Sequence, residues 1–288
     1  MTLLADLSTP VVMGILLGGL YAVIALGLSL VFGVVKEMNI AHGDFVILGS
    51  YIAYSALTSF GIDPIISLVI GVPLLFVIGF AVQKYLLNRT YRVSADATLI
   101  MTFGISIILQ NTFQLIWSPM SMGLSTPYSM ESLIIGPIRV PLVYFLNFLV
   151  AVIVMVVISE FLKRSYLGCA IRAAAQNRKA ANLMGINTYR IYAFTFAIAM
   201  ALAAIAGVFL GLTFPFTPVS GTSFLIIAFG VVVLGGLGSI IGTFIGGIFF
   251  GLAQTLGGYF FGITAQMLVA YVMVLLALVV IPRGIFGR

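Results

Sequence analysis

The sequence contains one short segment where several groups capable of acid–base chemistry occur together in a mostly apolar chain. This segment runs from Lys36 to Asp44 and reads Lys-Glu-Met-Asn-Ile-Ala-His-Gly-Asp. Ionisable groups inside a membrane are rare and mostly functional, so His42 and Asp44 together could form a proton relay. The simpler alternative is that Lys36 and Glu37 form an interfacial pair, while Asn39 and Asp44 cap helix ends. The residues alone leave both alternatives open.

Catalytic and metal-binding motifs are missing from the rest of the sequence. No Gly-x-x-x-x-Gly-Lys-[Ser/Thr] motif occurs, so the chain is not expected to bind ATP through a P-loop. A single histidine and a single cysteine, Cys169, exclude His-pair and Cys-based metal sites and an internal disulfide. We therefore predict no catalytic residue, no metal ligand and no directly bound cofactor. An intramembrane enzyme is disfavoured for the same reason.

Composition indicates what surrounds these few polar groups. Of the 288 residues, 62% are hydrophobic and 7% are charged, and the mean hydropathy is +1.26. A soluble domain has roughly a quarter of its residues charged, so a lipid bilayer must be the solvent for most of this chain. The net charge of +6 is spread thinly among apolar runs, which argues against a nucleic-acid partner.

Uncharged runs locate the expected membrane crossings, because a span needs about 20 apolar residues. They predict an all-α polytopic membrane protein with about eight or nine transmembrane helices, in a single domain covering residues 1–288. The expected spans are 7–35, 45–62, 64–83, 97–117, 140–159, 191–213, 217–236, 239–261 and 264–282. The segment 217–236 is expected to be short or broken, because Pro218 and Gly221 lie near its start. Interrupted segments of this kind often lie beside the substrate path of a transporter.

The regions outside the spans contain further signals. No Lys or Arg precedes Lys36, so the first span is expected to be retained and not cleaved as a signal peptide. A polar hairpin is expected at 118–140, where the breakers are Pro119, Gly123, Pro127, Gly136 and Pro137. Several helices have glycines spaced by four, which favours close helix packing or a subunit seam. These sets are Gly14/Gly18, Gly207/Gly211, Gly238/Gly242/Gly246, Gly247/Gly251 and Gly258/Gly262.

Positive charges predict the orientation, because cytoplasmic loops carry an excess of Lys and Arg. With the spans above and an N-terminus outside, Arg139 is the one cation expected outside. The cations expected inside are Lys36, Lys84, Arg89, Arg92, Lys163, Arg164, Arg172, Arg178, Lys179, Arg190, Arg283 and Arg288. The N-terminus is therefore expected on the outer side and the C-terminus in the cytoplasm.

Many of these cations gather in one stretch, residues 163–190, which we call the basic segment. It is rich in alanine and predicts a helix, with Gly185 as its C-cap and Asn187 as the N-cap of the next helix. One stripe of this helix is expected to consist of Ala173, Gln176, Ala180, Leu183 and Met184, opposite Arg178, Lys179 and Asn182. Such an amphipathic helix could lie on lipid headgroups or dock in a groove of another protein.

Two blocks of this sequence, together with its general hydropathy and a further stretch, resemble the permease subunits of bacterial branched-chain amino acid ABC importers of the Liv type. The first block is Gly27-Leu-Ser-Leu-Val-Phe-Gly33 followed by Asn39-Ile-Ala-His-Gly-Asp44. The second is Gly168-Cys-Ala-Ile-Arg-Ala-Ala-Ala-Gln-Asn177 with Ala180-Ala-Asn-Leu-Met-Gly-Ile-Asn187. The further stretch is Gly235-Gly-Leu-Gly-Ser-Ile-Ile-Gly242.

The resemblance implies a division of labour among several proteins in the bacterial inner membrane. A second homologous permease, two cytoplasmic ATPases and a periplasmic substrate-binding protein are the expected partners, and ATP is used by the ATPases. The ATPase-coupling residues would be Arg172, Ala173, Gln176, Ala180, Leu183, Met184 and Gly185. The translocation pathway would include Asn39, His42, Gly43, Asp44, Thr222 and Ser223. The alternatives are an ABC permease for urea or short amides, and a self-powered secondary transporter or channel.

Overall fold

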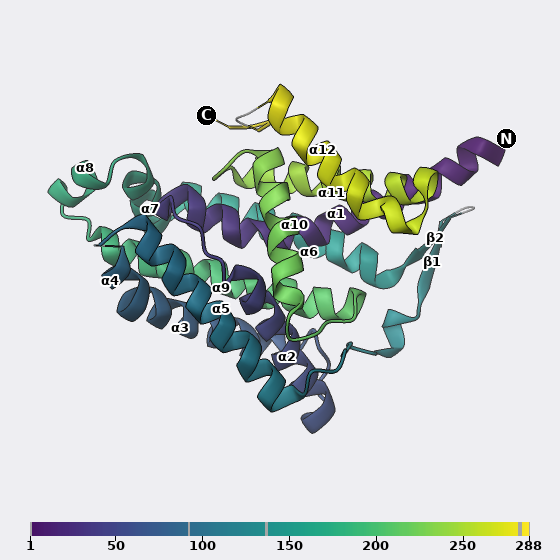
Figure 1. The fold of residues 1–288 in the computed structure, drawn as a ribbon, viewed down its shortest axis with the longest axis horizontal. Coiled ribbons are helices and arrows are strands. Elements are labelled where there is room, and N and C mark those ends of the chain that lie inside the picture. The colour runs from purple at the N-terminus through teal and green to yellow at the C-terminus, as the bar shows by residue number, and fades with distance from the viewer. Residues whose placement is uncertain (1, 92, 136–137, 282–283, 288) are drawn as a thin grey trace.

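We describe the protein from a computed structural model, which covers residues 2–91, 93–135, 138–281 and 284–287. The expectations placed on Arg92, Gly136, Pro137, Arg283 and Arg288 lie outside these residues. The described chain is a long bundle of helices, with a small hairpin at one end and two short helices at the other (Figure 1).

Helices make up nearly all of the regular structure. The long helices are α1 (Thr2–Val35), α2 (His42–Phe60), α3 (Leu68–Ala81), α5 (Ala95–Trp117), α6 (Leu142–Arg164), α9 (Thr188–Thr213), α10 (Ser220–Gly235), α11 (Ile240–Phe261) and α12 (Gln266–Val280). A π-helical segment (Val82–Leu87) joins α3 to α4 (Asn88–Thr90), and the basic segment contains α7 (Tyr166–Gln176) and α8 (Arg178–Leu183). Short 3₁₀ turns lie at Pro127–Ser129 and Ile263–Ala265. The strands β1 (Ser132–Ile135) and β2 (Ile138–Pro141) pair antiparallel, with Ser132 opposite Pro141.

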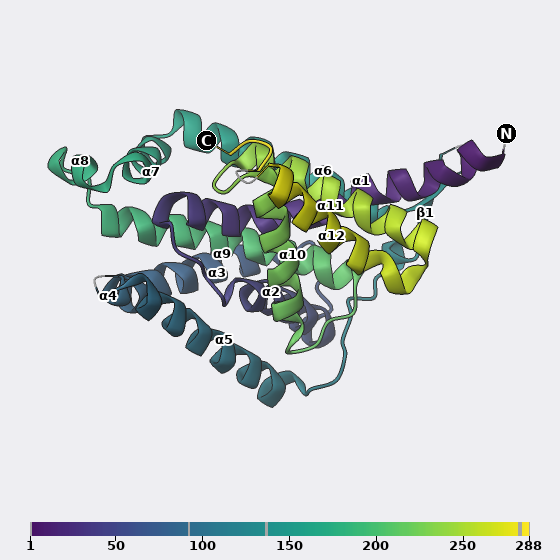
Figure 2. The ribbon, with the colours of Figure 1, turned by 45° about the horizontal axis from the view of Figure 1, so that its top comes forward.

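The prediction of an all-α polytopic membrane protein is confirmed. Seven of the described helical segments are long and apolar enough to cross a membrane, and α10 is a shorter apolar helix, as expected for 217–236. In Figures 1 and 2, α10 runs across the neighbouring long helices instead of alongside them. The polar hairpin at 118–140 contains the two strands, which the sequence had not predicted.

The second helix begins earlier than predicted, and this changes the setting of the polar residues. The expected start was residue 45, but α2 begins at His42 after a turn in which the Asn39 side-chain oxygen accepts from the Ala41 N–H at 3.1 Å. Gly43 and Asp44 therefore lie in the first turn of a buried helix and not in a loop. The direction of the Asp44 side chain is therefore fixed by the helix.

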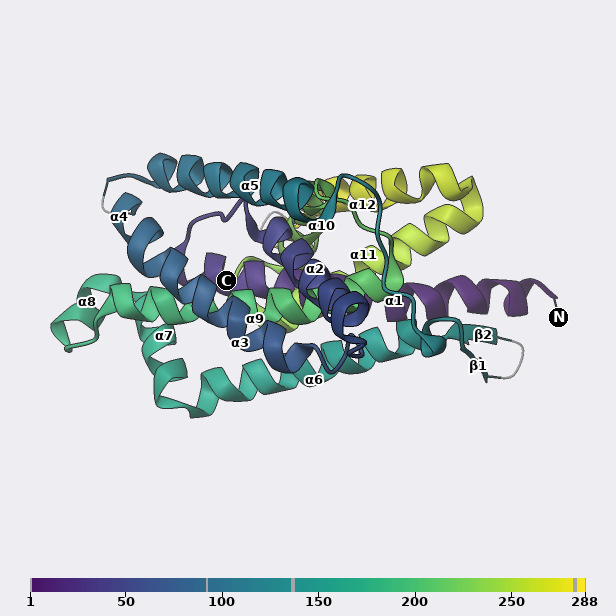
Figure 3. The same ribbon diagram turned by 90° about the horizontal axis from the view of Figure 1, so that it is seen from below.

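The core is built around α1 and α9. Their most apolar windows are 83% and 78% buried, against 17% for α5 and 11% for α12. Figure 3 shows these two helices between α5 on one side and α6 on the other. The predicted close packing through glycine is confirmed where α1 crosses α11, since a side chain on Gly18 would meet the backbone of Gly247 and Ile248. The pair Gly258/Gly262 instead has only ordinary contacts or open space around it.

Candidate functional site

A buried carboxylate lies where α2, α5 and α10 meet. Asp44 is 1% exposed, and its two oxygens accept hydrogen bonds from Ser106 Oγ at 2.5 Å and Gln110 Nε2 at 3.1 Å. The same Gln110 amide lies 3.5 Å from Thr222 Oγ1 at the start of α10. We call Asp44, Ser106, Gln110 and Thr222 the polar cluster. An apolar bundle keeps such a cluster only where each polar group has partners or a functional use.

The contribution of α5 was missed by the sequence analysis, although a signal was present. Thr98, Thr102, Ser106 and Gln110 are spaced by four, so they form one polar stripe on a helix that is otherwise apolar. Thr102 accepts the Ile40 N–H at 3.3 Å. The stripe thus follows the connection 36–41 and reaches Asp44 at the start of α2.

The crossing of α2 and α10 depends on two glycines in direct contact. A β-carbon built on Gly43 would overlap the carbonyl oxygen of Gly221, and one on Gly221 would overlap the Asp44 carboxylate. Each position therefore excludes any side chain larger than hydrogen. Thr222 and Ser223 follow at once, and both are exposed on the surface of the chain beside the cluster.

His42 is not part of the polar cluster. Its Nε2 donates to the carbonyl oxygen of Ile24 in α1 at 2.8 Å, and its ring packs against Gly27. Residues two apart on a helix point to different faces, so His42 faces α1 while Asp44 faces α5 and α10. The geometry therefore favours a structural role for His42 over a proton relay with Asp44.

The interfacial pair expected between Lys36 and Glu37 is not among the ion pairs of the described residues. Glu37 instead lies near Thr98 of the polar stripe and near the positive charge of Arg178. Burial raises the pKa of the Glu37 carboxyl above its usual range, while the Thr98 hydrogen bond and the Arg178 charge oppose that shift. The connection 36–41 thus lies between the basic segment and the polar cluster.

An apolar pocket of about 280 Å³ adjoins the polar cluster along α10. Leu225 and Ile226 lie three and four residues after Thr222, and both line this pocket together with Leu28 of α1. Residues at these spacings share one face of a helix. Asn39 and Ile40 of the connection 36–41 complete the wall. The pocket therefore lies along the face of α10 that begins at Thr222 of the polar cluster.

The basic segment forms two helices and not the single one predicted. Asn177 has an extended backbone, and its side chain accepts the Ala180 N–H at 3.1 Å, so α7 ends there and α8 begins. The predicted stripe is therefore divided between two helices. The Asn187 side chain caps α9, which confirms that prediction. The C-cap of α8 is Met184 and not Gly185, which follows it with a positive φ of 84°.

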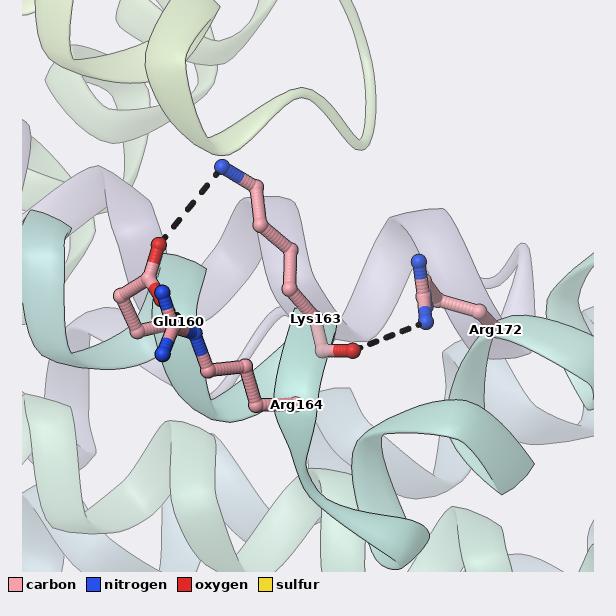
Figure 4. Close-up of polar contacts among 4 residues, drawn as sticks. All are labelled: Glu160, Lys163, Arg164 and Arg172. Atoms are coloured by element: carbon pink, nitrogen blue, oxygen red, sulfur yellow. Dashed lines mark hydrogen bonds and ion pairs between the residues drawn. The ribbon is translucent and has the colours of Figure 1, made fainter.

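A compact turn fixes the start of the basic segment to α6. Arg172 donates from its guanidinium to the Lys163 carbonyl at 3.3 Å, and Glu160 pairs with both Lys163 and Arg164 (Figure 4). The ion pairs are exposed, so each adds only about 0–1 kcal/mol. The hydrogen bond from Arg172 has a positional effect, because it holds α7 against the end of α6.

The far end of the basic segment projects from the bundle. In Figure 1, α8 lies at the opposite end of the molecule from the β-hairpin. Leu183 and Met184 are 88% and 82% exposed, and Gln176, Ala180 and Gly185 are also exposed. Two large apolar side chains at the tip of a basic projection are typical of a docking site for another protein.

Arg178 anchors this projection to the bundle. Its guanidinium lies 4.7 Å from the ring centres of both Tyr91 and Tyr189, and 6.0 Å from that of Tyr192. We call this arrangement the tyrosine clamp. Since Arg178 also lies near Glu37, the clamp joins α8 to the start of α9, to the end of α4 and to the connection 36–41.

Comparison with known proteins gives a consistent picture over the whole chain. A model of the family described as branched-chain amino acid transport system / permease component matches residues 11–278. The high-affinity branched-chain amino acid transport system permease protein LivH of Salmonella typhimurium is 33% identical over 289 residues, covering 96% of this chain and 94% of LivH. The corresponding permease protein BraD of Pseudomonas aeruginosa is 35% identical over 301 residues, with coverage of 96% and 94%.

A solved structure supports the fold independently. The structure described as PsaBC from Streptococcus pneumoniae in complex with Fab has a TM-score of 0.53 to this chain at 16% identity. The match covers 98% of this chain and 94% of the solved chain. At that identity the likeness concerns the helical architecture alone.

Proposed function

The chain belongs to the family of branched-chain amino acid transport permeases, and from this we propose that it is the membrane-spanning subunit of an ATP-driven importer in the bacterial inner membrane. A second permease, two cytoplasmic ATPases and a periplasmic binding protein would complete the transporter. The observation that carries this proposal is the exposed tip of α8, which the tyrosine clamp fixes to the bundle. The sequence has no P-loop, so an ATP-driven importer built on this chain would receive the energy of ATP hydrolysis through such a contact.

The mechanism follows from the connections within the bundle. ATP binding would close the ATPase pair and move α8, and Arg178 would transmit the movement to α9 and to the connection 36–41. That connection and the polar stripe of α5 lead to Asp44, where α2, α5 and α10 meet. The translocation pathway would pass the polar cluster and the apolar pocket, with Asn39, Gly43, Thr222 and Ser223 beside it. ATP and the binding protein would favour different states of the bundle.

Reconstitution in liposomes tests the proposal. Liposomes that contain this chain, the second permease and the ATPases are expected to accumulate leucine, isoleucine or valine when ATP and the ligand-loaded binding protein are supplied. Omission of the ATPases should abolish accumulation. Accumulation by this polypeptide alone would instead establish a secondary transporter or channel. Uptake of urea or a short amide in preference to the amino acids would establish the other permease alternative.

The single cysteine provides a direct test of the orientation. Cys169 is exposed on α7, so a membrane-impermeant maleimide should label it in inside-out vesicles and leave it unlabelled in right-side-out vesicles. Labelling is measured by the mass shift of the purified chain. Permeabilised right-side-out vesicles are the control, in which labelling should be restored. Labelling of intact right-side-out vesicles would reverse the proposed topology.

Removal of the tyrosine clamp is expected to uncouple ATP hydrolysis from uptake. Arg178→Ala removes two close guanidinium–ring contacts, which together contribute about 1–2 kcal/mol, so uptake per ATP hydrolysed should fall about tenfold. Arg178→Lys keeps the charge near Glu37 but loses the planar stacking, so an intermediate loss is expected. The neighbouring exposed residue supplies the control, Lys179→Ala, which should leave the ratio unchanged. An unchanged ratio in Arg178→Ala would contradict the coupling role of the clamp.

A further inference from the structure

A second pocket, distinct from the polar cluster, lies at the end of the bundle that carries α8. It has a volume of about 470 Å³ and opens between the end of α3 with its π-helical extension and the first turn of α9. Its wall includes Phe80, Lys84, Asn88, Asn187, Arg190 and Ala193. One lining residue, Tyr189, belongs to the tyrosine clamp, but the proposed transport mechanism gives the cavity itself no ligand.

The pocket carries two positive charges without a countercharge. Among the residues that the structure describes, neither Lys84 nor Arg190 forms an ion pair, and both side chains are exposed. The Asn88 amide donates to the Tyr189 carbonyl at 3.2 Å, which holds the two walls together. The first turn of α9 adds the partial positive charge of a helix N-terminus. The positive charge of this wall therefore favours an anion as the ligand.

The surroundings of the pocket indicate which anion. One of its walls is the end of an outer helix, whose most apolar window is only 22% buried, and this end is cytoplasmic in the topology on which the proposed function rests. Val69 and Val77 of that helix are exposed, and Phe80 continues the apolar surface into the pocket. A phosphate between Lys84 and Arg190 would thus have an apolar helix face beside it for acyl chains. Basic pockets between helices on the cytoplasmic side bind anionic lipid headgroups in this way.

We propose that this pocket binds the phosphate headgroup of an anionic phospholipid. Its position has a consequence for α8, because Asn187 and Arg190, at the end of the basic segment, are the N-cap and a first-turn residue of α9. A bound lipid would hold the start of α9, including Tyr189 of the tyrosine clamp, against the π-helical extension of α3. The lipid would thereby stabilise the arrangement through which α8 is anchored.

Lipid retention by the purified full-length chain tests the assignment. The chain is equilibrated in detergent with dioleoyl phosphatidylglycerol or dioleoyl phosphatidylcholine, and bound lipid is measured by native mass spectrometry. We expect phosphatidylglycerol to be retained in preference to phosphatidylcholine. The double variant Lys84→Gln/Arg190→Gln should weaken retention of phosphatidylglycerol about tenfold. The matched control Lys163→Gln/Lys179→Gln loses the same charge outside the pocket and should retain the lipid as the unsubstituted chain does.

Three results would overturn the assignment. Equal retention by the pocket variant and the control would mean that the lipid binds elsewhere. Stabilisation of the chain against heat by inorganic phosphate but not by phosphatidylglycerol would assign the pocket to a free anion. Equal retention of phosphatidylcholine and phosphatidylglycerol by the unsubstituted chain would show that the pocket does not select an anionic headgroup. None of these results depends on amino acid uptake, so the lipid site and the proposed function can fail separately.

Discussion

Gly43→Ala is expected to destroy the crossing of α2 and α10 and, with it, both the folded bundle and transport. The added methyl group would overlap the Gly221 carbonyl oxygen, which belongs to the backbone of a packed helix and cannot rotate away as a side chain could. Overpacking of this kind costs about 3 kcal/mol, which is roughly a hundredfold shift in the population of the native arrangement. The measurements are the thermal stability of the purified chain and uptake by the reconstituted transporter.

A second glycine in the same group of helices provides the control. Gly104 lies on α5, and a β-carbon at this position would have no heavy atom within 4 Å. Gly104→Ala should therefore leave stability and uptake unchanged, or stabilise α5 slightly, because alanine is the better helix former. If Gly43→Ala were as stable and active as Gly104→Ala, the close crossing of α2 and α10 would be wrong.

The membrane architecture could be predicted from the sequence because charges are excluded from the bilayer centre. The 92 residues from Ile191 to Pro282 contain no ionisable Asp, Glu, Lys, Arg or His side chain, and breakers near Pro218 and Gly236 divide that run. Each expected span therefore corresponds to a helix, although among the described helices α2 is not one of the seven that are long and apolar enough to cross a membrane and α10 is shorter. The direction of α10 could not be predicted, since hydropathy records only whether a helix is apolar and not how it crosses its neighbours.

The polar cluster was only half predictable for a related reason. Asp44 is conspicuous as a carboxylate among apolar residues, whereas Ser106 and Gln110 resemble the ordinary polar residues of a membrane helix. Only their spacing of four from Thr98 and Thr102 distinguishes them, and that pattern gains its meaning from packing against the connection 36–41. Local composition could not reveal which helix would face Asp44.

The break in the basic segment results from a competition between helix propensity and capping by a side chain. The alanine content alone does not show this competition. Alanine favours a continuous helix through 166–184, but Asn177 can satisfy the Ala180 N–H with its own side chain and so start a new helix. The break turns α8 away from α7. It allows Arg178, the first residue of α8, to reach the tyrosines while Leu183 stays exposed.

The second large effect is expected from Asp44→Asn, which removes the negative charge of the polar cluster with almost no change in shape. The asparagine oxygen can still accept from Gln110, so the chain should fold and reach the membrane. A zwitterionic amino acid would lose the countercharge for its ammonium group, at a cost of about 3 kcal/mol, and uptake should fall roughly a hundredfold. Asp96→Asn, an exposed change in the first turn of α5, should leave uptake unaltered.

The same variant separates the two classes of substrate left open for a permease of this kind. Urea and short amides carry no positive charge, so their passage should depend on the hydrogen bonds of Ser106, Gln110 and Thr222 more than on the charge of Asp44. For such a substrate Asp44→Asn should change uptake by only about two- to tenfold, which is the effect of one hydrogen bond. A hundredfold loss with correct folding therefore favours an ammonium-bearing substrate. Undiminished uptake of an amino acid by Asp44→Asn would show that the polar cluster holds the helices together but lies off the translocation pathway.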